Sequence, residues 1–342
     1  MKRLARIPGM KFWTLLLLMT GSLGSCDILE EEAEDCAVYV RFKYDMNMEF
    51  ADAFQNAVNS VTLYAFDKDG VLAFQKTEEG EILKQDGYRM RLDDISHSDK
   101  AEYDFITWAG EPDNESFTIP VLTVGKHTKN DLFCQLNRAG DGIVNDNLDE
   151  LFHGQVSNLN FGRAAMEPGE EVVMPLVKNT NSIRIMLQHI SGSPLNVDDF
   201  QFSITDYNGK MNYDNTLLDK DVKISYQAWY TGDGNADVEG ANSGTPSINV
   251  AIAELSVARL MADAKPVLTI TNQEGKEILK LDLVQCALMY KREKHKDMSN
   301  QEYLDREDEY NFTFFLDDGY RWVSSSIIIN SWRVVFQNSD LQ

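Results

Sequence analysis

The stretch VTLYAFDKDGVLAF, residues 61–74, decides the fold class that this sequence predicts. Residues 61–66 and 71–74 are two short runs rich in apolar and β-branched side chains, which favour strands. Between them, residues 67–70 (DKDG) have the composition of a tight turn, in which glycine adopts a left-handed backbone without steric cost. The stretch therefore predicts a β-hairpin.

The same signals continue along most of the chain. Residues 38–44 alternate between apolar side chains and residues such as Arg41 and Lys43, as expected of a half-buried strand. Further strands are predicted at 103–109, 116–124, 182–187, 200–205, 267–271, 278–283, 310–316 and 327–336. Short helical connections are predicted at 48–58 and 299–309, and a long surface loop at 231–244. Short strands with few helices indicate an all-β protein, and two tandem antiparallel β-sandwich domains fit the pattern best.

A turn with a cluster of charges divides these predicted strands into two groups. Residues 167–171 (EPGEE) interrupt the hydrophobic pattern, and a new series of strands starts at 172–176 (VVMPL). We therefore expect an N-terminal β-sandwich at 37–171 and a C-terminal β-sandwich at 172–342. The length of 342 residues agrees with two domains.

Residues 1–25 have the layout of a secretory signal peptide. Basic residues precede an apolar run from Phe12 to Met19, and small residues follow. The run is about half of the ~20 residues that a spanning helix needs, so a permanent transmembrane anchor is disfavoured. Residues 23–26 (LGSC) resemble the lipobox of bacterial lipoproteins, which predicts cleavage before Cys26 and lipidation of that cysteine. The alternative is an ordinary secreted protein with a chance cysteine near its cleavage site.

The residues after Cys26 are strongly acidic. Residues 27–35 (DILEEEAED) are too polar to join a core, so we interpret 26–36 as a solvated tether. Removal of residues 1–25 takes four of the 32 basic residues and none of the 55 acidic ones, which leaves a net charge of −27. Such a surface repels nucleic acid and anionic headgroups, so neither is an expected partner. Membrane attachment would then depend on the lipid, in which each buried CH₂ contributes about 0.8 kcal/mol.

Candidate catalytic and metal-binding residues are few. The five histidines form none of the close pairings that bind metals: His97, His127, His153, His189 and His295. Residues 235–240 (NADVEG) resemble the first half of a calcium loop, but Pro246 stands at the twelfth position, where a bidentate Glu belongs. A pair of catalytic carboxylates cannot be recognised from spacing alone. We therefore expect a non-enzymatic protein with no metal and no cofactor.

The remaining cysteines leave two alternatives. If Cys26 is acylated, then Cys36, Cys134 and Cys286 allow at most one intramolecular disulfide, and their spacing matches no zinc or redox motif. Buried free thiols are the alternative, and they are common in protein cores.

Five segments carry a family resemblance through their order and spacing: residues 36–70, 176–187 (LVKNTNSIRIML), 254–261 (ELSVARLM), 301–318 (QEYLDREDEYNFTFFLDD) and 327–335 (IIINSWRVV). Together they resemble the FimB-type fimbrial anchor family of the Bacteroidales, the lipoprotein subunits of type V fimbriae. The resemblance implies two transthyretin-like β-sandwich domains and attachment of the fimbrial rod to the outer membrane. Acidic residues after the lipidated cysteine resemble the signal that sends lipoproteins to the outer face of that membrane.

The resemblance also implies partners and contact residues. The expected partners are fimbrial shaft (pilin) subunits and, through the lipid on Cys26, the outer membrane. In such fimbriae a strand of one subunit fills a groove in the next, and Trp332, Val334 and Phe336 alternate as that strand would. The alternative, which the pattern favours, is a final core strand in the chain's own sheet. We interpret Tyr44, Asp45 and Phe50, and the charged and aromatic residues of 302–306, as structural, with hydrogen bonds and an ion pair organising a loop.

Two functions follow from these patterns. The first is a surface lipoprotein that anchors a fimbrium and limits its length. The second is a surface glycan-binding lipoprotein of a polysaccharide-uptake system, which would need an exposed platform of aromatic residues. Its candidates are Trp108, Trp229 with Tyr230, and Trp322.

Overall fold

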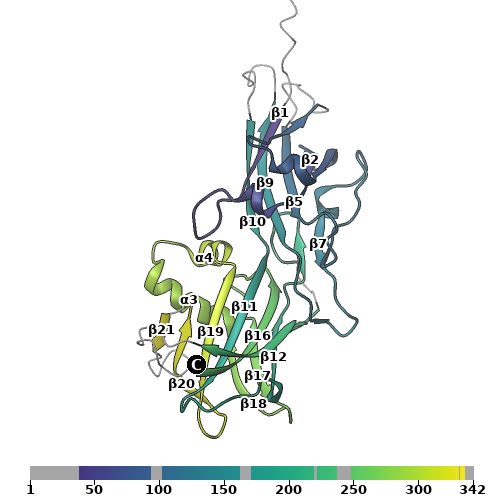
Figure 1. The fold of residues 1–342 in the computed structure, drawn as a ribbon. Helices are drawn as coiled ribbons and strands as arrows, with labels where there is room; N and C mark the ends of the chain where they lie inside the picture. Colours follow the sequence, from purple (N-terminus) through teal and green to yellow (C-terminus); the bar gives the residue numbers. More distant parts are fainter. Residues whose placement is uncertain are drawn as a thin grey trace, which may run out of the picture.

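The computed structural model describes residues 38–93, 102–161, 171–218, 222–236, 248–330 and 332–335. Its strands form an N-terminal sheet and a C-terminal pair of sheets that follow one another along the long axis of the molecule (Figure 1). The chain is all-β, as predicted, with several sheets and few helices.

The N-terminal sheet has seven strands. They are β1 (Val38–Lys43), β2 (Ser60–Asp67), β3 (Leu72–Glu79), β4 (Met90–Leu92), β5 (Glu102–Gly110), β9 (Leu151–Asn160) and β10 (Glu171–Lys178). Their order in the sheet is β3-β2-β5-β9-β10-β1-β4. The predicted hairpin is therefore confirmed as β2 and β3.

The turn of this hairpin is held as its sequence requires. Gly70 has a φ of +76°, and its N–H donates to the carbonyl oxygen of Asp67 at 2.8 Å. The carboxylate of Asp67 accepts from the N–H groups of Asp69 and Val71 at 3.0 and 2.9 Å. Glycine at the left-handed position and an aspartate that binds the backbone two residues on together close the turn.

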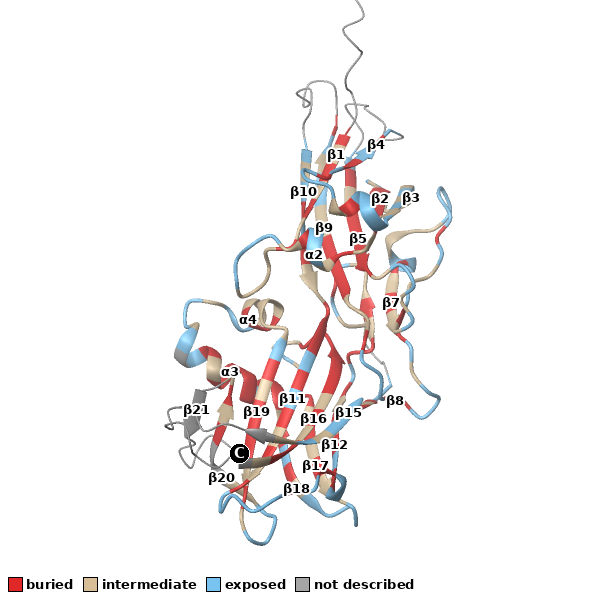
Figure 2. Cartoon of the chain, in the orientation of Figure 1, coloured by how far each residue is buried: buried red, intermediate tan, exposed pale blue. Residues whose placement is uncertain are grey.

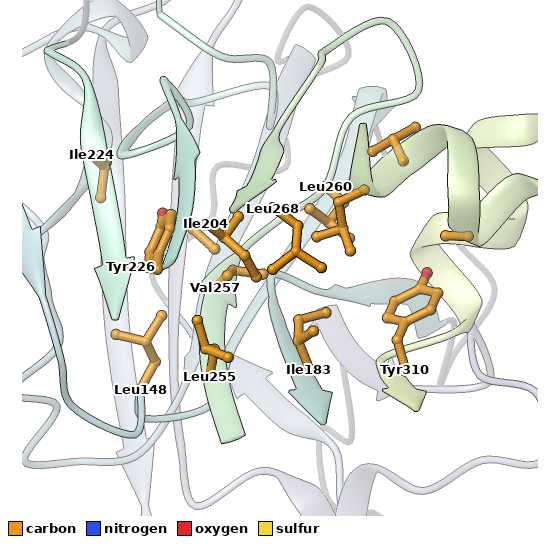
Figure 3. Packing of buried hydrophobic residues seen from close by; sticks show 14 of the residues in the cluster. Leu148, Ile183, Ile204, Ile224, Tyr226, Leu255, Val257, Leu260, Leu268 and Tyr310 are labelled. Atoms are coloured by element: carbon orange, nitrogen blue, oxygen red, sulfur yellow. The ribbon is translucent and has the colours of Figure 1, made fainter. Parts of the chain in front are cut away.

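Two further sheets form the C-terminal sandwich. One contains β11 (Thr180–His189), β15 (Tyr230–Ala236), β16 (Ile248–Ala258), β19 (Glu309–Leu316), β20 (Trp322–Ile329) and β21 (Trp332–Val335), in the order β15-β16-β11-β19-β20-β21. The other contains β8 (Ile143–Val144), β12 (Phe200–Asp206), β14 (Ile224–Gln227), β17 (Val267–Asn272) and β18 (Glu277–Asp282), in the order β18-β17-β12-β14-β8. Figure 3 shows Ile183 and Leu255 of the first sheet near Ile204 and Leu268 of the second.

The remaining elements are short. A three-stranded sheet contains β6 (Phe117–Thr118), β7 (Phe133–Leu136) and β13 (Lys210–Asn212). The helices are α2 (Phe54–Ala57), α3 (Leu283–Lys294) and α4 (Asn300–Arg306), with 3-10 turns η1 (Gly80–Lys84), η2 (Lys129–Asp131) and η3 (Val197–Asp199). At 12 residues, α3 is the longest helix in the described ranges, and none of them could cross a membrane.

Strand β2 is buried on both faces, which explains its lack of polar alternation. Leu63 and Ala65 belong to one apolar cluster, with residues of β1 and β5. Tyr64 and Phe66 belong to a second cluster that extends through the C-terminal sandwich. Figure 2 shows the buried residues continuing along the strands of both parts. One face of the N-terminal sheet therefore shares a continuous apolar core with the sandwich, and its other face has a separate apolar cluster.

Two expectations about the sheets need correction. Strand β10, expected to open the second domain, pairs with β1 and β9 of the N-terminal sheet, so the change of sheet falls between Lys178 and Thr180. The sheets are mixed, because β1–β10, β11–β19 and β8–β14 are parallel pairs. Long connections of the kind that separates β1 from β10 permit parallel pairing, whereas short hairpins do not.

The predicted strand 327–336 is also wrong as a single element. Asn330 has a φ of +45°, and the chain turns there from β20 into β21, with Ile329 opposite Trp332. Asparagine tolerates this left-handed backbone better than most residues, which suits it to a tight hairpin turn. Residues 231–236 of the predicted loop 231–244 belong to β15 instead, and residues 237–244 lie outside the described ranges.

Candidate assembly site

The structure places two of the three predicted subunit-contact residues on an edge strand. Trp332 and Val334 lie in β21, the last strand of the six-stranded sheet, opposite Ile329 and Ile327 of β20. Residues 332–335 therefore belong to the chain's own sheet, which was the favoured alternative. Phe336 lies outside the described residues, as does the predicted lipidation site Cys26. Contact of this strand with another subunit stays a prediction.

Two of the segments that carried the family resemblance meet in space. Arg306, at the end of α4, donates from Nη1 to the carbonyl oxygens of Asp45 and Asn47 at 2.9 and 3.3 Å. Its guanidinium lies 4.5 Å from the ring centre of Phe50, and its Nε donates to Glu302 at 3.1 Å. The predicted hydrogen bonds and ion pair are present in the structure, and a purely structural role for these residues stays an interpretation. The contact between the two segments was not predicted.

A buried ion pair holds the other face of α4. Arg259 donates from Nε and Nη2 to the two carboxylate oxygens of Asp305, both at 2.9 Å, and from Nη1 to the carbonyl oxygen of Asn215 at 2.7 Å. Arg259 is only 9% exposed. The Gln301 side chain donates to Asp305 at 2.9 Å, so this carboxylate has donors from two elements. Planar two-point pairing of this kind fixes geometry as well as charge.

Lys178 links the end of the N-terminal sheet to the start of β19. Its Nζ lies 2.7 Å from both Glu150 and Asp308. Burial disfavours the charged amine, but the two carboxylates more than offset this and hold the pKa of Lys178 above its ordinary value. Beside it, burial and the charge of Asp308 raise the pKa of Glu307 to about 7. The junction between the two parts is therefore a network of charged side chains around α4 and the start of β19.

The aromatic residues considered for a glycan platform do not come together. Trp108 is 2% exposed and packs edge-on against His153, with ring centres 4.7 Å apart. Trp322 packs against Phe314 at the core, with ring centres 6.0 Å apart. Trp229 and Tyr230 are exposed, and their ring centres are 6.0 Å apart. Of the candidates, this last pair alone is placed to meet a ligand.

The described residues contain no group of three His, Cys, Asp or Glu side chains that could hold a metal ion. Asn235 and Ala236 of the calcium candidate pair with Asn249 and Ile248 as part of β15, and residues 237–240 lie outside the described ranges. Burial lowers the pKa of His153 to about 4 and leaves it a neutral core histidine. Its hydrogen bond to the carbonyl oxygen of Tyr213, at 2.8 Å, acts in the opposite direction but is the smaller effect.

One of the possible disulfides is excluded. Cys134 and Cys286 are buried free thiols, so they do not pair with each other. Burial raises the pKa of both thiols, to about 12 for Cys286, which makes them unreactive. Cys36 lies outside the described residues.

Comparisons with known proteins point to one family. The model of the fimbrillin-A associated anchor proteins Mfa1 and Mfa2 matches residues 32–338. The comparison with curated protein sequences gives no match.

Solved structures agree with this assignment. A proposed polysaccharide-binding protein of Bacteroides thetaiotaomicron has 33% identity and a TM-score of 0.75, over 90% of this chain and 100% of that one. A proposed adhesin of the same organism has 32% identity and a TM-score of 0.76, over 88% and 97%. The fimbrial anchor protein Mfa2 of Porphyromonas gingivalis has the same fold, with 16% identity and a TM-score of 0.65 over 88% and 99%. The chain therefore belongs to the family of fimbrillin-A associated anchor proteins.

Proposed function

We propose that this chain attaches a fimbrium to the outer membrane through a lipid on Cys26, from an exposed position on the cell surface. The observation that carries the proposal is the family match over residues 32–338, which begins six positions after Cys26, the last of the lipobox-like residues 23–26. The family is one of fimbrial anchor proteins, not of enzymes. After removal of residues 1–25 the chain has a net charge of −27, which an anionic membrane surface repels. Attachment to the membrane would therefore depend on the lipid.

The partners on the other side are shaft (pilin) subunits. We propose that the terminal segment with Trp332, Val334 and Phe336 takes part in this contact, because β21 is the last strand of its sheet among the described residues and pairs there with β20 alone. An edge strand offers main-chain groups to a further strand. A lipid-anchored subunit at the base would end the rod, so the protein would also limit fimbrial length. We also propose that the predicted domains 37–171 and 172–342 are two successive β units, with the boundary between them moved to residues 178–180.

Deletion of the gene tests the anchoring role. We expect fimbriae to appear in the culture medium and to be lost from the cells, measured by electron microscopy and by sedimentation of shed fimbriae. Fimbriae that remain on the cells at wild-type levels would contradict the proposal.

The lipid is tested by Cys26→Ala, with Cys36→Ala as its matched control. We expect Cys26→Ala to lose palmitate labelling and to leave the membrane fraction, because no other acylation site adjoins the predicted cleavage site. Cys36→Ala should keep both properties. Equal labelling of the two variants would show that Cys26 is not the lipidated residue.

A second candidate function, glycan binding, is favoured by the exposed pair Trp229 and Tyr230. Trp229 lines a hollow of about 190 Å³ on the outer face of the six-stranded sheet, with Arg184, Glu254 and Asn311. The strand register puts Tyr230, Glu254, Arg184 and Asn311 in one row across four adjacent strands. Arg184 donates to Glu254 at 2.9 and 2.7 Å. An aromatic wall beside such polar groups suits the apolar face and hydroxyls of a sugar ring.

The position of Tyr230 depends on a glycine. A Cβ atom at Gly232 would lie 2.5 Å from the Tyr230 hydroxyl, so the ring lies over a residue without a side chain. The hollow carries one basic side chain, Arg184, against the two acidic ones of Glu254 and Glu309. This balance favours a neutral sugar over an acidic one.

Binding is tested with maltoheptaose, cellohexaose and mannohexaose, followed by tryptophan fluorescence and calorimetry. Trp229→Ala and Gly232→Ala should weaken binding about 10-fold or more, since one displaced aromatic contact is worth about 1–2 kcal/mol. Tyr207→Ala, at a tyrosine that is 58% exposed elsewhere, should leave it unchanged. No saturable signal with any of the three sugars at about 10 mM would exclude this second function.

A further inference from the structure

A second hollow lies at the end of the sandwich, between three turns. It has a volume of about 380 Å³ and is lined by residues at the start of β12, in the β17–β18 hairpin and in the β19–β20 hairpin. We call it the distal hollow; its lining includes Asp199, Phe200, Lys276, Ile278, Tyr320 and Arg321. In Figure 1 these turns lie at the opposite end of the molecule from the start of β1, where the described chain begins.

An aromatic ring is held at the mouth of the distal hollow at a cost in backbone strain. Tyr320 has a φ of +54°, which a residue with a side chain rarely adopts, and it is 48% exposed. Its ring centre lies 6.3 Å from those of Phe200 and His189. Strain of this kind persists where the surrounding structure enforces it, often at binding sites.

The surrounding turn does enforce it. The Asp317 carboxylate accepts from the N–H groups of Gly319 and Arg321, both at 2.9 Å, and from Arg321 Nε at 3.0 Å. The N–H of Tyr320 donates to the carbonyl oxygen of Asp317 at 2.9 Å. These donors also hold the pKa of Asp317 below its ordinary value. Tyr320 is therefore positioned before any partner arrives, which reduces the entropy lost on binding.

The charges around the distal hollow favour a basic partner. Asp199, Glu274 and Glu277 line it with Lys276 and Arg321. Arg321 is paired with Asp317, and Glu277 lies 3.9 Å from Lys280 in an exposed pair, so Asp199 and Glu274 are the acidic side chains that outweigh Lys276. An acidic rim around apolar and aromatic side chains matches an apolar residue flanked by lysine or arginine.

We propose that the distal hollow is the docking surface for the first shaft subunit, and that it receives an apolar or aromatic side chain next to a basic one. This inference rests on the proposed anchoring function: if the N-terminal end is tied to the membrane, the rod leaves from the other end. The direction of β21 agrees, because β20 starts directly after the turn with Tyr320 and β21 runs back along it, with Val335 opposite Ser326. The edge strand and the distal hollow thus serve one subunit interface.

The test uses fimbriated cells that produce the full lipidated chain with Tyr320→Gly. Glycine suits a φ of +54°, so the turn should persist without the ring. The matched control is Tyr207→Ala, an exposed tyrosine after the opposite end of β12. A central tyrosine at an interface typically changes affinity about 30-fold, so we expect shed fimbriae to increase at least about 10-fold for Tyr320→Gly and not for the control. Both variants should reach the membrane and melt at the wild-type temperature.

Two further measurements make the outcome unambiguous. Glu274→Lys is a second variant that tests the same surface if Tyr320→Gly does not fold. Residue 274 lies in an exposed turn, so we expect Glu274→Lys to fold and to increase the shedding of fimbriae, because the new positive charge repels a basic partner. A photoreactive residue at position 320 should form an adduct with the shaft subunit, and one at position 207 should not.

The deletion strain separates the test of the docking surface from the test of the anchoring function. If deletion releases fimbriae but folded Tyr320→Gly and Glu274→Lys retain them, and position 320 gives no shaft adduct, then the docking surface lies elsewhere and the anchoring function stands. If the deletion strain keeps its fimbriae, both proposals are wrong.

Discussion

Arg306 donates a hydrogen bond to the carbonyl oxygen of Asp45 at 2.9 Å, across 261 positions of sequence. This contact ties α4, which belongs to the C-terminal half of the chain, to the loop after the first strand of the N-terminal sheet. If the chain connects a membrane to a fimbrium, as we propose, then a pull on one part reaches the other through this junction and through the apolar core that the two parts share.

Replacement of Arg306 by alanine tests the junction. The change removes hydrogen bonds to Asp45 and Asn47, the ion pair with Glu302 and the contact with Phe50. We expect a loss of about 1–3 kcal/mol in the free energy of unfolding, measured in urea. Arg292→Ala, at an exposed residue of α3, is the control and should cost less than about 0.5 kcal/mol. Equal effects would mean that the contacts of Arg306 contribute nothing to stability.

Asp305→Ala should be more damaging, because it leaves the buried guanidinium of Arg259 without a carboxylate. Breaking one partner of a buried pair typically costs about 3–5 kcal/mol. The double variant Arg259→Met/Asp305→Leu should recover part of this loss, since no charge is then buried alone. Asp93→Ala, in the exposed pair with Arg91, should cost less than about 1 kcal/mol. The free energies of unfolding of the wild type and the three variants are compared by denaturant unfolding. A double variant no more stable than Asp305→Ala would contradict the prediction that the unpaired guanidinium causes the loss.

Glu307 should make stability depend on pH between about 4.5 and 7. Its pKa is raised to about 7 in the folded protein, mainly by burial, from 4.5. In this window the folded state holds more protons than the unfolded state, so the contribution of Glu307 to stability falls as pH rises. Glu307→Gln should remove that fall, so that its stability relative to wild type increases from pH 5 to pH 8.

His153 acts in the opposite direction in much of the same window. Its pKa is lowered to about 4, so the unfolded state binds the extra proton and stability rises with pH up to about 6.5. The comparison of Glu307→Gln with wild type at each pH cancels this contribution. A stability difference that is constant from pH 5 to pH 8 would show that the carboxyl of Glu307 titrates normally.

Gly154 of β9 should not tolerate alanine. A Cβ atom there would lie 2.7 Å from the carbonyl oxygen of Pro175 and 2.9 Å from side-chain atoms of Leu176 and Met174. Overpacking of this kind costs about 1–3 kcal/mol, because backbone must move to relieve it. Gly140, which has open space around it, is the matched control. Thermal melting should separate Gly154→Ala from Gly140→Ala by several degrees, and identical midpoints would contradict the close contact between β9 and β10.

Several elements could be predicted because their signals are local. The β2–β3 hairpin follows from its apolar runs and its DKDG turn, and α4 begins where Ser299 accepts from the N–H of Glu302. Helix α3 was missed, although Asp282 caps it by accepting from the N–H of Gln285 and its last turn is basic. Those end signals could have found it. The adjoining strand residues 278–283 carried a stronger apolar pattern, which hid the start of the helix.

The candidate sites were less predictable, because they depend on contacts between distant segments. Sequence alone could not show that Trp108 is buried whereas Trp229 and Tyr230 are exposed, because aromatic residues suit both a core and a ligand-binding surface. The distal hollow was not predicted at all, since its walls come from three turns between residues 199 and 321. The one local signal for it was the aspartate-glycine turn at 317–319, which holds Tyr320.

The sequence by itself determined the all-β class, the hairpin at 61–74, the family and the acidic character of the chain, because these depend on residue type and on spacing within a few positions. The tertiary structure alone decided that β10 joins the N-terminal sheet, that β21 forms an edge, and that Arg306 reaches Asp45. Strand pairing and side-chain contacts between distant segments depend on how the shared core packs. A local sequence pattern does not indicate which segments far apart in the chain lie close together in space.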